Sequence, residues 1–330
     1  MPRRSLRFGT LAAALALMSF GSPPASAQEW PSRPVTLVVT FAAGSSDDVL
    51  ARIVSARLSE ILGQQVIVEN VAGAGGMTGV SRVAKAPADG YQAVLGGTGT
   101  FAANQTLYKK PLYNAVQDFA PTALIAEQPI LLVARKDLPA DNLQEFIAYA
   151  KANQRQLQYG SGGVGSATHL GCILLNSAIG VAATHVPYRA AAMALQDLVA
   201  GRIDYVCPIA SVAIGHIEAG QVKPIAILSK SRAPILPHLA SAAEQGLAGF
   251  DAYMWDGIFL PKATPAAIVQ KLHDAVVAVM DTPAVRERMA TIGAELVAGD
   301  RRSPEYLHSF VASEVEKWAL PIRASGASLD

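Results

Sequence analysis

The chain alternates short apolar runs, of the kind found in buried strands, with segments that carry helical periodicity. The first run covers residues 35–41, and a helical pattern follows it over about residues 47–62 and ends at Gly63. The same unit recurs, with strands predicted at residues 65–69, 91–95, 157–160, 184–187 and 203–207, and a helix near residues 78–86. Strands separated by helices favour parallel α/β sheets. Because 330 residues suffice for roughly two domains, we expect two such sheets.

Two further runs are candidates for connections between the domains. Residues 124–134 form an apolar stretch that is long for one strand, and residues 222–228 resemble a second connecting segment. Helices are predicted to close the last third of the chain, over about residues 264–280 and 304–322.

The first 27 residues have the three-part pattern of a secretory signal peptide. Residues 1–7 contain three arginines, residues 8–21 form an apolar run, and Ala25-Ser26-Ala27 is a small-residue cleavage site after two prolines. The apolar run is shorter than the roughly 20 residues that a membrane-spanning helix needs, which argues against a membrane anchor. We therefore predict cleavage after Ala27 and export of the mature chain to the periplasm.

Charge and cysteine usage narrow the classes of function. The chain has 27 Lys and Arg against 26 Asp and Glu, and 6% aromatic residues, so it lacks the basic, aromatic-rich pattern typical of nucleic-acid binders. Cys172 and Cys207 are the only cysteines and form no C-x-x-C pair, which argues against a disulfide-dense scaffold and a structural zinc site. The two thiols could pair with each other or remain free.

Small polar residues are concentrated in the loops that follow three of the predicted strands. These loops, at residues 41–48, 96–101 and 159–169, are rich in Gly, Ser and Thr. Ligands of open α/β sheets bind beyond the carboxyl ends of the strands. A helix N-terminus there offers free N–H groups and a positive dipole end to an anion. The alternative is that the serines and threonines only cap helices. Three such loops at equivalent positions favour a shared site for an anion or a polar ligand.

Motifs of catalysis and cofactor binding are weak or absent. Gly160-x-Gly162-x-x-Gly165 imitates a dinucleotide fingerprint, but the acid expected about 20 positions later is missing and the next one is Asp197. No G-x-S-x-G elbow, P-loop or H-E-x-x-H motif occurs, and no two histidines are spaced i, i+4. We therefore expect no cofactor, no metal and no catalytic residue. His169 stays a candidate ligand contact because it lies at a loop–helix junction.

A longer set of motifs runs through the whole mature chain. It begins with the strand and the loop Phe-Ala-Ala-Gly-Ser-Ser-Asp-Asp within residues 34–52. It continues at residues 66–76, 84–91, 107–109, 118–121, 159–170, 185–188, 197–201, 216–220, 246–250 and at Trp255. In this order the motifs resemble the Bug family, the TctC-like periplasmic solute-binding receptors of tripartite tricarboxylate transporters.

This resemblance implies a type II periplasmic-binding-protein fold, an α/β fold with two lobes, a ligand cleft between them and two crossover hinge segments. One lobe would comprise residues 28–127 and 226–330, and the other residues 128–225. The hinges would lie near residues 124–128 and 224–226 and would let the lobes close on the ligand.

The resemblance also implies a function without chemistry. The protein would be a monomeric receptor that captures a small organic carboxylate and delivers it to the membrane subunits of a tripartite tricarboxylate-type transporter. A receptor for a membrane sensor kinase would use the same closed lobe pair as its signal. A periplasmic enzyme is the remaining alternative, and it would need a nucleophile–base pair in the cleft.

The residues expected to bind the ligand follow from the same resemblance. In the family, ligand carboxylates are held largely by backbone amides and ordered water in the first loop and by the glycine-rich loop of the other lobe. The matching positions are Phe41, Ala42, Gly44, Ser45, Ser46 and Asp48, then Gly162, Gly165, Ser166 and His169. The predicted cleft is completed by Thr98, Thr100, Phe101, Tyr188, Arg189 and Pro208.

Two departures from the family pattern favour an apolar ligand body. Cys207-Pro208-Ile209 stands where many relatives read Phe-Asp-Asn, which removes the acid that amino-acid-binding members use to hold an ammonium group. Phe101 stands where His is frequent and predicts a more apolar wall. We therefore expect a mono- or dicarboxylate, aromatic acids included, rather than an amino acid.

Three further departures concern polar groups. Ser45-Ser46 replace a Gly-Gly pair and add hydroxyl donors. Arg189 takes a place often held by Lys, and it could clamp a carboxylate with two hydrogen bonds or form a surface salt bridge. Asp256 also departs from the pattern, and the sequence offers no role for it.

Overall fold

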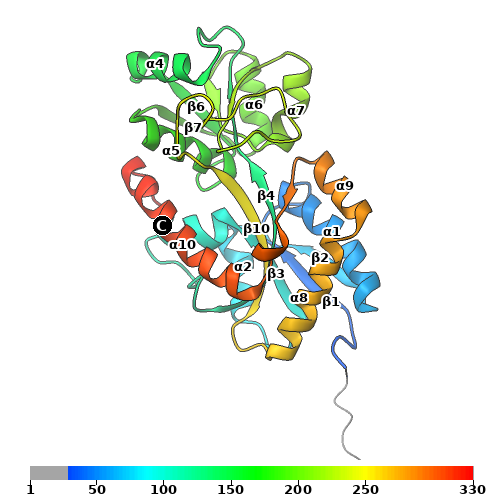
Figure 1. Cartoon of the computed structure of the whole chain (residues 1–330). Helices are drawn as coiled ribbons and strands as arrows, with labels where there is room; N and C mark the ends of the chain where they lie inside the picture. Colours follow the sequence, from blue (N-terminus) through cyan, green and yellow to red (C-terminus); the bar gives the residue numbers. More distant parts are fainter. Residues whose placement is uncertain (1–28, 330) are drawn as a thin grey trace, which may run out of the picture.

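The protein consists of two α/β lobes stacked along one axis (Figure 1). The computed structural model describes residues 29–329, so the predicted signal peptide and its cleavage site lie outside the described residues. No helix within the described range is long and apolar enough to cross a membrane.

Lobe 1 is the lobe built on a six-stranded sheet of order β11-β4-β10-β3-β1-β2. Its strands are β1 (Val35–Val39), β2 (Val66–Asn70), β3 (Gln92–Gly97), β4 (Phe119–Pro129), β10 (Tyr253–Pro261) and β11 (Glu295–Leu296). β1 pairs in parallel with β2 and β3, as the alternation predicted, whereas β10 runs antiparallel to β3 and β4. The sheet is therefore mixed, because β4 leaves lobe 1 and β10 returns to it in the opposite direction.

Helices cover both faces of the lobe 1 sheet. Leu37 and Val39 of β1 face a core shared with α1 (Ser46–Leu62) and α8 (Ala266–Met280), and Val38 faces the core on the other side. α2 (Met77–Ala84) and α10 (Pro304–Ser325) cover that second side (Figure 1). β1 is buried on both faces, which explains why its sequence is a continuous apolar run rather than an alternating one.

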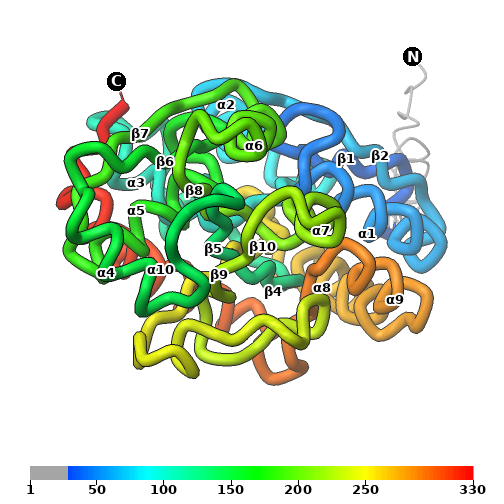
Figure 2. The backbone as a smooth tube through the Cα atoms, turned by 90° about the horizontal axis from the view of Figure 1, so that it is seen from above, coloured from blue at the N-terminus to red at the C-terminus, as the bar shows by residue number. Residues whose placement is uncertain are grey.

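Lobe 2 is the lobe built on a five-stranded sheet of order β7-β6-β8-β5-β9. Its strands are β5 (Leu131–Ala134), β6 (Gln158–Ser161), β7 (Thr184–Pro187), β8 (Tyr205–Val206) and β9 (Lys223–Ile227). β6 is parallel to β7 and β8, and β5 is antiparallel to β8 and β9. The helices of lobe 2, which Figure 2 shows lying over lobe 1, are α4 (Leu143–Asn153), α5 (Ala167–Ile179), α6 (Ala191–Val199) and α7 (Ala210–Glu218).

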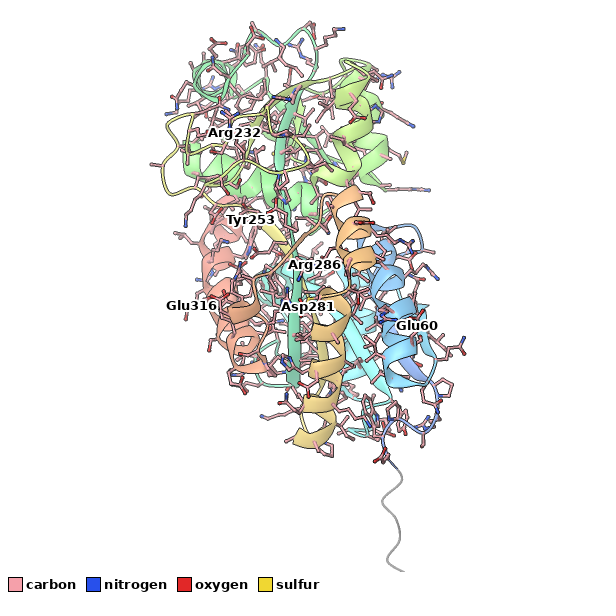
Figure 3. The ribbon with its side chains drawn as sticks, turned by 45° about the vertical axis from the view of Figure 1, so that its right-hand side comes forward. Glu60, Arg232, Tyr253, Asp281, Arg286 and Glu316 are labelled. Atoms are coloured by element: carbon pink, nitrogen blue, oxygen red, sulfur yellow. The ribbon has the colours of Figure 1, made fainter. Side chains whose placement is uncertain are left out.

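The remaining elements are short or lie near the C-terminus. They are the 3₁₀ turns η1 (Ala74–Gly76) and η3 (Gly299–Arg301), the π-helical η2 (Thr98–Ala103), α3 (Asn104–Leu107) and α9 (Pro283–Thr291). Asp281, between α8 and α9, accepts hydrogen bonds from Arg286 at 2.7 Å and from Arg302 at 2.9 Å. Figure 3 shows Asp281 and Arg286 side by side at this corner of lobe 1.

Two backbone segments join the lobes, at Ile130 and at Ala252. Leu228 N–H donates to Ile130 O at 2.7 Å, and Ala252 N–H donates to Leu228 O at 2.8 Å. Tyr253, labelled in Figure 3, begins β10 at this junction and is paired with Pro129 of β4. The two crossings are thus held together by main-chain hydrogen bonds.

The predicted hinges at residues 124–128 and 224–226 fall inside β4 and β9. β9 pairs with β5 in lobe 2, and Gln245 further along still bonds the first turn of α4 through Leu143 N–H. We therefore propose that lobe 2 runs from Ile130 to Ala252 rather than over residues 128–225. Residues 228–252, which follow β9, mix apolar and polar residues without a regular pattern. Their sequence therefore gives no local signal that they stay with lobe 2.

Cys172 and Cys207 are both fully buried and free, which answers the question that the sequence left open. Burial raises the pKa of the Cys172 thiol well above its usual range. Both cysteines therefore serve as small core residues of lobe 2.

Candidate functional site

A cavity of about 470 Å³ lies between the lobes, a volume that suits a small ligand. The loops after β1, β3 and β6 line it, together with the beginnings of α6 and α7 and parts of β4 and β10. Of the predicted site residues the cavity brings together eleven: Phe41, Ala42, Gly44, Ser45, Ser46, Thr98, Thr100, Gly162, Gly165, Ser166 and Arg189. The other five, Asp48, Phe101, His169, Tyr188 and Pro208, do not line it.

The conformation of the first cavity loop, residues 41–48, is fixed by the buried carboxylate of Asp48. Ser45 caps α1 by accepting from Asp48 N–H, and the Asp48 side chain accepts from Gly44 N–H at 2.9 Å. Burial opposes the charge of Asp48, yet hydrogen bonds from Arg52, Gly44 and Asn70 lower the pKa of its carboxyl. Asp48 therefore positions the amides of the loop and does not itself reach the cavity.

The glycine-rich loop before α5 is organised in the same way. Ser166 caps α5 by accepting from His169 N–H, and the Thr168 hydroxyl accepts from Gly162 N–H at 2.8 Å. His169 is buried behind the loop, where its Nδ1 accepts from Gly165 N–H at 3.2 Å. Burial and the neighbouring His185 lower the pKa of His169 to about 3, so that the ring is neutral and can accept this bond. His169 supports the loop from behind.

Lobe 2 also contributes a cation and free amides. Arg189 is exposed and lines the cavity directly before α6, and within residues 29–329 it forms no ion pair. The surface salt bridge considered for it is therefore not made in the described chain. The N-cap residues of α6 and α7 are Ala190 and Ile209, whose side chains provide no cap. Some first-turn N–H groups of these helices remain available to an anion.

Tyr188 and Pro208, both predicted in the cleft, have structural partners instead. The Tyr188 hydroxyl donates to Asp197 at 2.7 Å, and the Pro208 carbonyl accepts from Leu131 N–H at 2.8 Å. Neither residue lines the cavity.

Phe101 was expected to form an apolar wall, and the structure places it in the lobe 1 core. Its ring stacks on Phe259 with centroids 3.8 Å apart, and it meets the edge of Phe119 at 4.9 Å. The ring fits there because Gly96 has no side chain, since a Cβ on Gly96 would lie 2.2 Å from it. The winding of η2 presents Thr98 and Thr100 to the cavity and turns Phe101 inward.

Three acidic or amide side chains in the cavity were missed by sequence reasoning. They are Asp47 at the start of α1, Gln128 near the end of β4 and Asp256 in β10. Burial, and then the charge of Asp47, raise the pKa of Asp256 well above its usual range, and burial raises that of Asp47. The available signals were the departure at Asp256 and the presence of Asp47 beside Asp48 at the end of the first loop.

Two α/β lobes with two crossings and a ligand-sized cavity between them define a periplasmic binding protein. The sequence profile of the tripartite tricarboxylate transporter family receptor, TctC, matches residues 50–327. The chain belongs to this family of periplasmic solute-binding receptors, which includes the Bug proteins.

Relatives with similar sequences and structures cover nearly the whole chain. A UPF0065 protein from the TAR-I ttuE-ttuC′ intergenic region of Agrobacterium vitis is 39% identical and spans 92% of this chain and 87% of its own. MatC from Rhodopseudomonas palustris, solved with bound malate, has a TM-score of 0.80 and 38% identity, and covers 88% of this chain and 99% of its own. R. palustris Rpa4515, solved with adipate, has a TM-score of 0.81 and 36% identity, with coverages of 90% and 98%.

Proposed function

We propose that this protein is a periplasmic receptor that captures a small organic carboxylate in the cavity between its lobes. The ligand is a mono- or dicarboxylate, aliphatic or aromatic, and the loaded receptor delivers it to the membrane subunits of a tripartite tricarboxylate-type transporter. The observation that carries this proposal is the convergence of Arg189 with the beginnings of α1, α5, α6 and α7 on one cavity. These groups are donors or positive dipole ends, which suit a carboxylate. Binding of malate and adipate by two similar receptors supports the same ligand class.

The protein binds its ligand without transforming it. Ser166 lines the cavity, and its hydroxyl donates a hydrogen bond to the Gly163 carbonyl at 2.7 Å. The nearby His169 accepts from Gly165 N–H through Nδ1. A short Ser–His hydrogen bond does exist between Ser161 and His185, at 2.6 Å. Ser161 is fully buried and neither residue lines the cavity, so this pair has no access to a ligand there.

The experiment is a thermal-shift and calorimetric screen of the chain from Gln28 to Asp330 against malate, adipate, citrate and benzoate. A ligand that binds only the folded state raises the melting temperature by mass action. We expect at least one carboxylate to do so, and Arg189→Gln to weaken its binding roughly ten-fold or more, because a charge-assisted hydrogen bond is lost.

Arg155→Gln is the matched control, since Arg155 is exposed on lobe 2 away from the cavity. This variant is expected to bind as the parent does. Absence of any stabilisation by the four carboxylates would contradict the proposal. Loss of carboxylate uptake in cells that lack the receptor, restored by the parent chain and not by Arg189→Gln, would establish delivery to the transporter.

A further inference from the structure

The lobe 1 wall of the cavity contains a buried carboxyl group beside a buried amide oxygen. Asp256 is 4% exposed and Gln128 is 2% exposed, and both line the cavity. Gln128 Nε2 donates to Asp256 Oδ2 at 3.4 Å, whereas Gln128 Oε1 is buried without a hydrogen-bond partner. A buried carboxylate is costly unless its charge is neutralised, and a buried acceptor is costly unless a donor reaches it. The two neighbouring side chains therefore lack a positive charge and a donor.

The register of the sheet brings these two side chains together. In the β4–β10 ladder Gln128 pairs with Met254, and Ala126 pairs with Asp256. Gln128 and Asp256 are therefore diagonal neighbours on the same face of the ladder. On the β3 side, Asp256 Oδ1 would lie 2.9 Å from a Cβ on Gly97, so the glycine leaves room for the carboxyl. The pair is thus held by two strands of lobe 1 rather than by a loop.

The groups around Asp256 supply no neutralising cation within residues 29–329. β3 presents Gly97 to it, β4 presents Gln128, and α1 contributes the carboxyl of Asp47 to the same cavity. Arg189 is the one cation that lines the cavity in the described chain, and it is exposed on lobe 2 without an ion pair. Burial, with the negative charge of Asp47 nearby, raises the pKa of Asp256 well above its usual range.

One proton on Asp256 supplies what both side chains lack. An un-ionised carboxyl has one O–H to donate and keeps an oxygen that accepts. A carboxylic acid and a carboxamide can pair through two hydrogen bonds, and the contact from Gln128 Nε2 to Asp256 is one of these two. Burial is a recognised way to keep a carboxyl neutral so that it can donate. Asp47 is only half-buried and accepts from the Ser46 hydroxyl, so its charge is the easier of the two to maintain.

We propose that Asp256 is un-ionised at neutral pH, that it donates its hydrogen bond to Gln128 Oε1, and that carboxylate binding in the cavity depends on this proton. This inference rests on the proposed function and adds a specificity-determining residue to its site. The proton removes one of two negative charges that would repel an anionic ligand from the lobe 1 wall. Arg189 and the positive dipole ends of α6 and α7 on lobe 2 can then hold the ligand.

Infrared difference spectroscopy tests the proton without any ligand. An un-ionised carboxyl has a C=O stretching band that a carboxylate lacks. We expect this band in the parent at pH 7 and its loss in Asp256→Asn, which is nearly isosteric. Asp300→Asn, at an exposed position on η3, is the matched control and is expected to keep the band, as is Asp47→Asn. A parent spectrum without the band, or a band that only Asp47→Asn removes, would overturn the proposal.

A second measurement applies where Asp256→Asn fails to fold by circular dichroism. The spectrum of Asp47→Asn is then recorded with and without carbon-13-labelled aspartate. Asp47 and Asp256 are the two aspartates of the cavity wall, so a band that shifts with the label in this variant belongs to Asp256. Absence of a band that shifts with the label would count against the proposal.

Isothermal titration calorimetry over a pH series tests the role of the proton in binding. The probe is the tightest binder among malate, adipate, citrate and benzoate. We expect its affinity to hold wherever the infrared band persists and to fall at least ten-fold as rising pH removes the band, because an ionised Asp256 repels the carboxylate. In Asp256→Asn this fall is expected to disappear.

The outcomes separate this inference from the proposed function. A fall in affinity while the band persists, a fall that Asp256→Asn shares in full, or a constant affinity after the band is lost would overturn the role in binding while carboxylate binding stands. If none of the four acids binds, the proposed function and the role of the proton in binding both fail. The infrared band still decides the protonation of Asp256 in that case.

Discussion

At the scale of single residues, the cavity depends on polar side chains that lie behind it. Asp48 accepts from Gly44 N–H, and His169 accepts from Gly165 N–H, so each fixes one glycine of a cavity loop. Neither residue lines the cavity. The amides that face a ligand are therefore oriented by buried acceptors, and the protonation states of those acceptors affect the stability of the site.

The first prediction concerns His169 and pH. The pKa of His169 is about 3 in the folded protein and about 6.5 in the unfolded chain, so only the unfolded state gains a proton as the pH falls below 6.5. The stabilisation is complete above pH 6.5 and is lost progressively toward pH 3. When the pH falls from 8 to 5, we expect this titration of His169 to lower the unfolding free energy by about 2 kcal/mol.

Urea unfolding of a His169→Gln variant at the two pH values measures this contribution. The variant is expected to lose about 2 kcal/mol less than the parent between pH 8 and pH 5, whatever its absolute stability. His308→Gln, which removes an exposed histidine of α10, is expected to keep the full loss of the parent. Equal losses in the parent and in His169→Gln would show that His169 titrates normally in the folded state.

At the scale of secondary-structure elements, the site is a set of helix beginnings with different caps. α1 and α5 are capped by Ser45 and Ser166, whereas α6 and α7 have no side-chain cap where they meet the cavity. Capped helices hold their first turns without a ligand. The uncapped helices leave N–H groups that a bound carboxylate can satisfy.

The second prediction compares two caps of the same kind at different places. Ser166 accepts from His169 N–H at the cavity, and Ser303 accepts from Tyr306 N–H at the start of α10, remote from it. Replacing either serine by alanine is expected to lower the unfolding free energy by about 1 kcal/mol. Only Ser166→Ala is expected to weaken carboxylate binding, by about five-fold, because Ser166 also holds the cavity loop through its hydrogen bond to the Gly163 carbonyl, and one such bond contributes about 1 kcal/mol. Calorimetric titration of both variants checks this, and equal effects on affinity would contradict it.

At the scale of the whole molecule, one of the hydrophobic cores extends through both lobes. A single cluster of buried residues joins Val38 and Trp255 of lobe 1 to Leu132 and Tyr205 of lobe 2. The glycine-rich loop before α5 also approaches lobe 1 closely, since a Cβ on Gly99 would lie 3.3 Å from the Gly165 carbonyl. The lobes are therefore coupled on one side of the cavity as well as through the two crossings.

The third prediction is that the protein unfolds in one cooperative transition. All three tryptophans, Trp30, Trp255 and Trp318, belong to lobe 1, so tryptophan fluorescence reports on that lobe while far-ultraviolet circular dichroism reports on both. Because the core is shared, we expect the two signals to give coincident transitions in urea. A circular dichroism curve with a second midpoint, absent from the fluorescence curve, would show that lobe 2 unfolds independently.

The sequence by itself determined the class of fold, the family and most of the loops around the cavity. The continuous apolar run of β1, the end of α1 at Gly63 and the capping serines are local patterns, and each depends on residues a few positions apart. Such patterns can be predicted from one chain. Glycines and serines in three loops therefore located the site before any contact was known.

Only the tertiary structure decided which side chains enter the cavity. Phe101 turns inward because Gly96 leaves space for its ring, and Asp256 meets Gln128 because β10 and β4 pair in one particular antiparallel register. The proposed place of the second crossing, near Ala252, depends on hydrogen bonds that hold the segment after β9 on lobe 2. These arrangements join residues that are far apart in the chain, and they depend on packing and strand register, which no local pattern encodes.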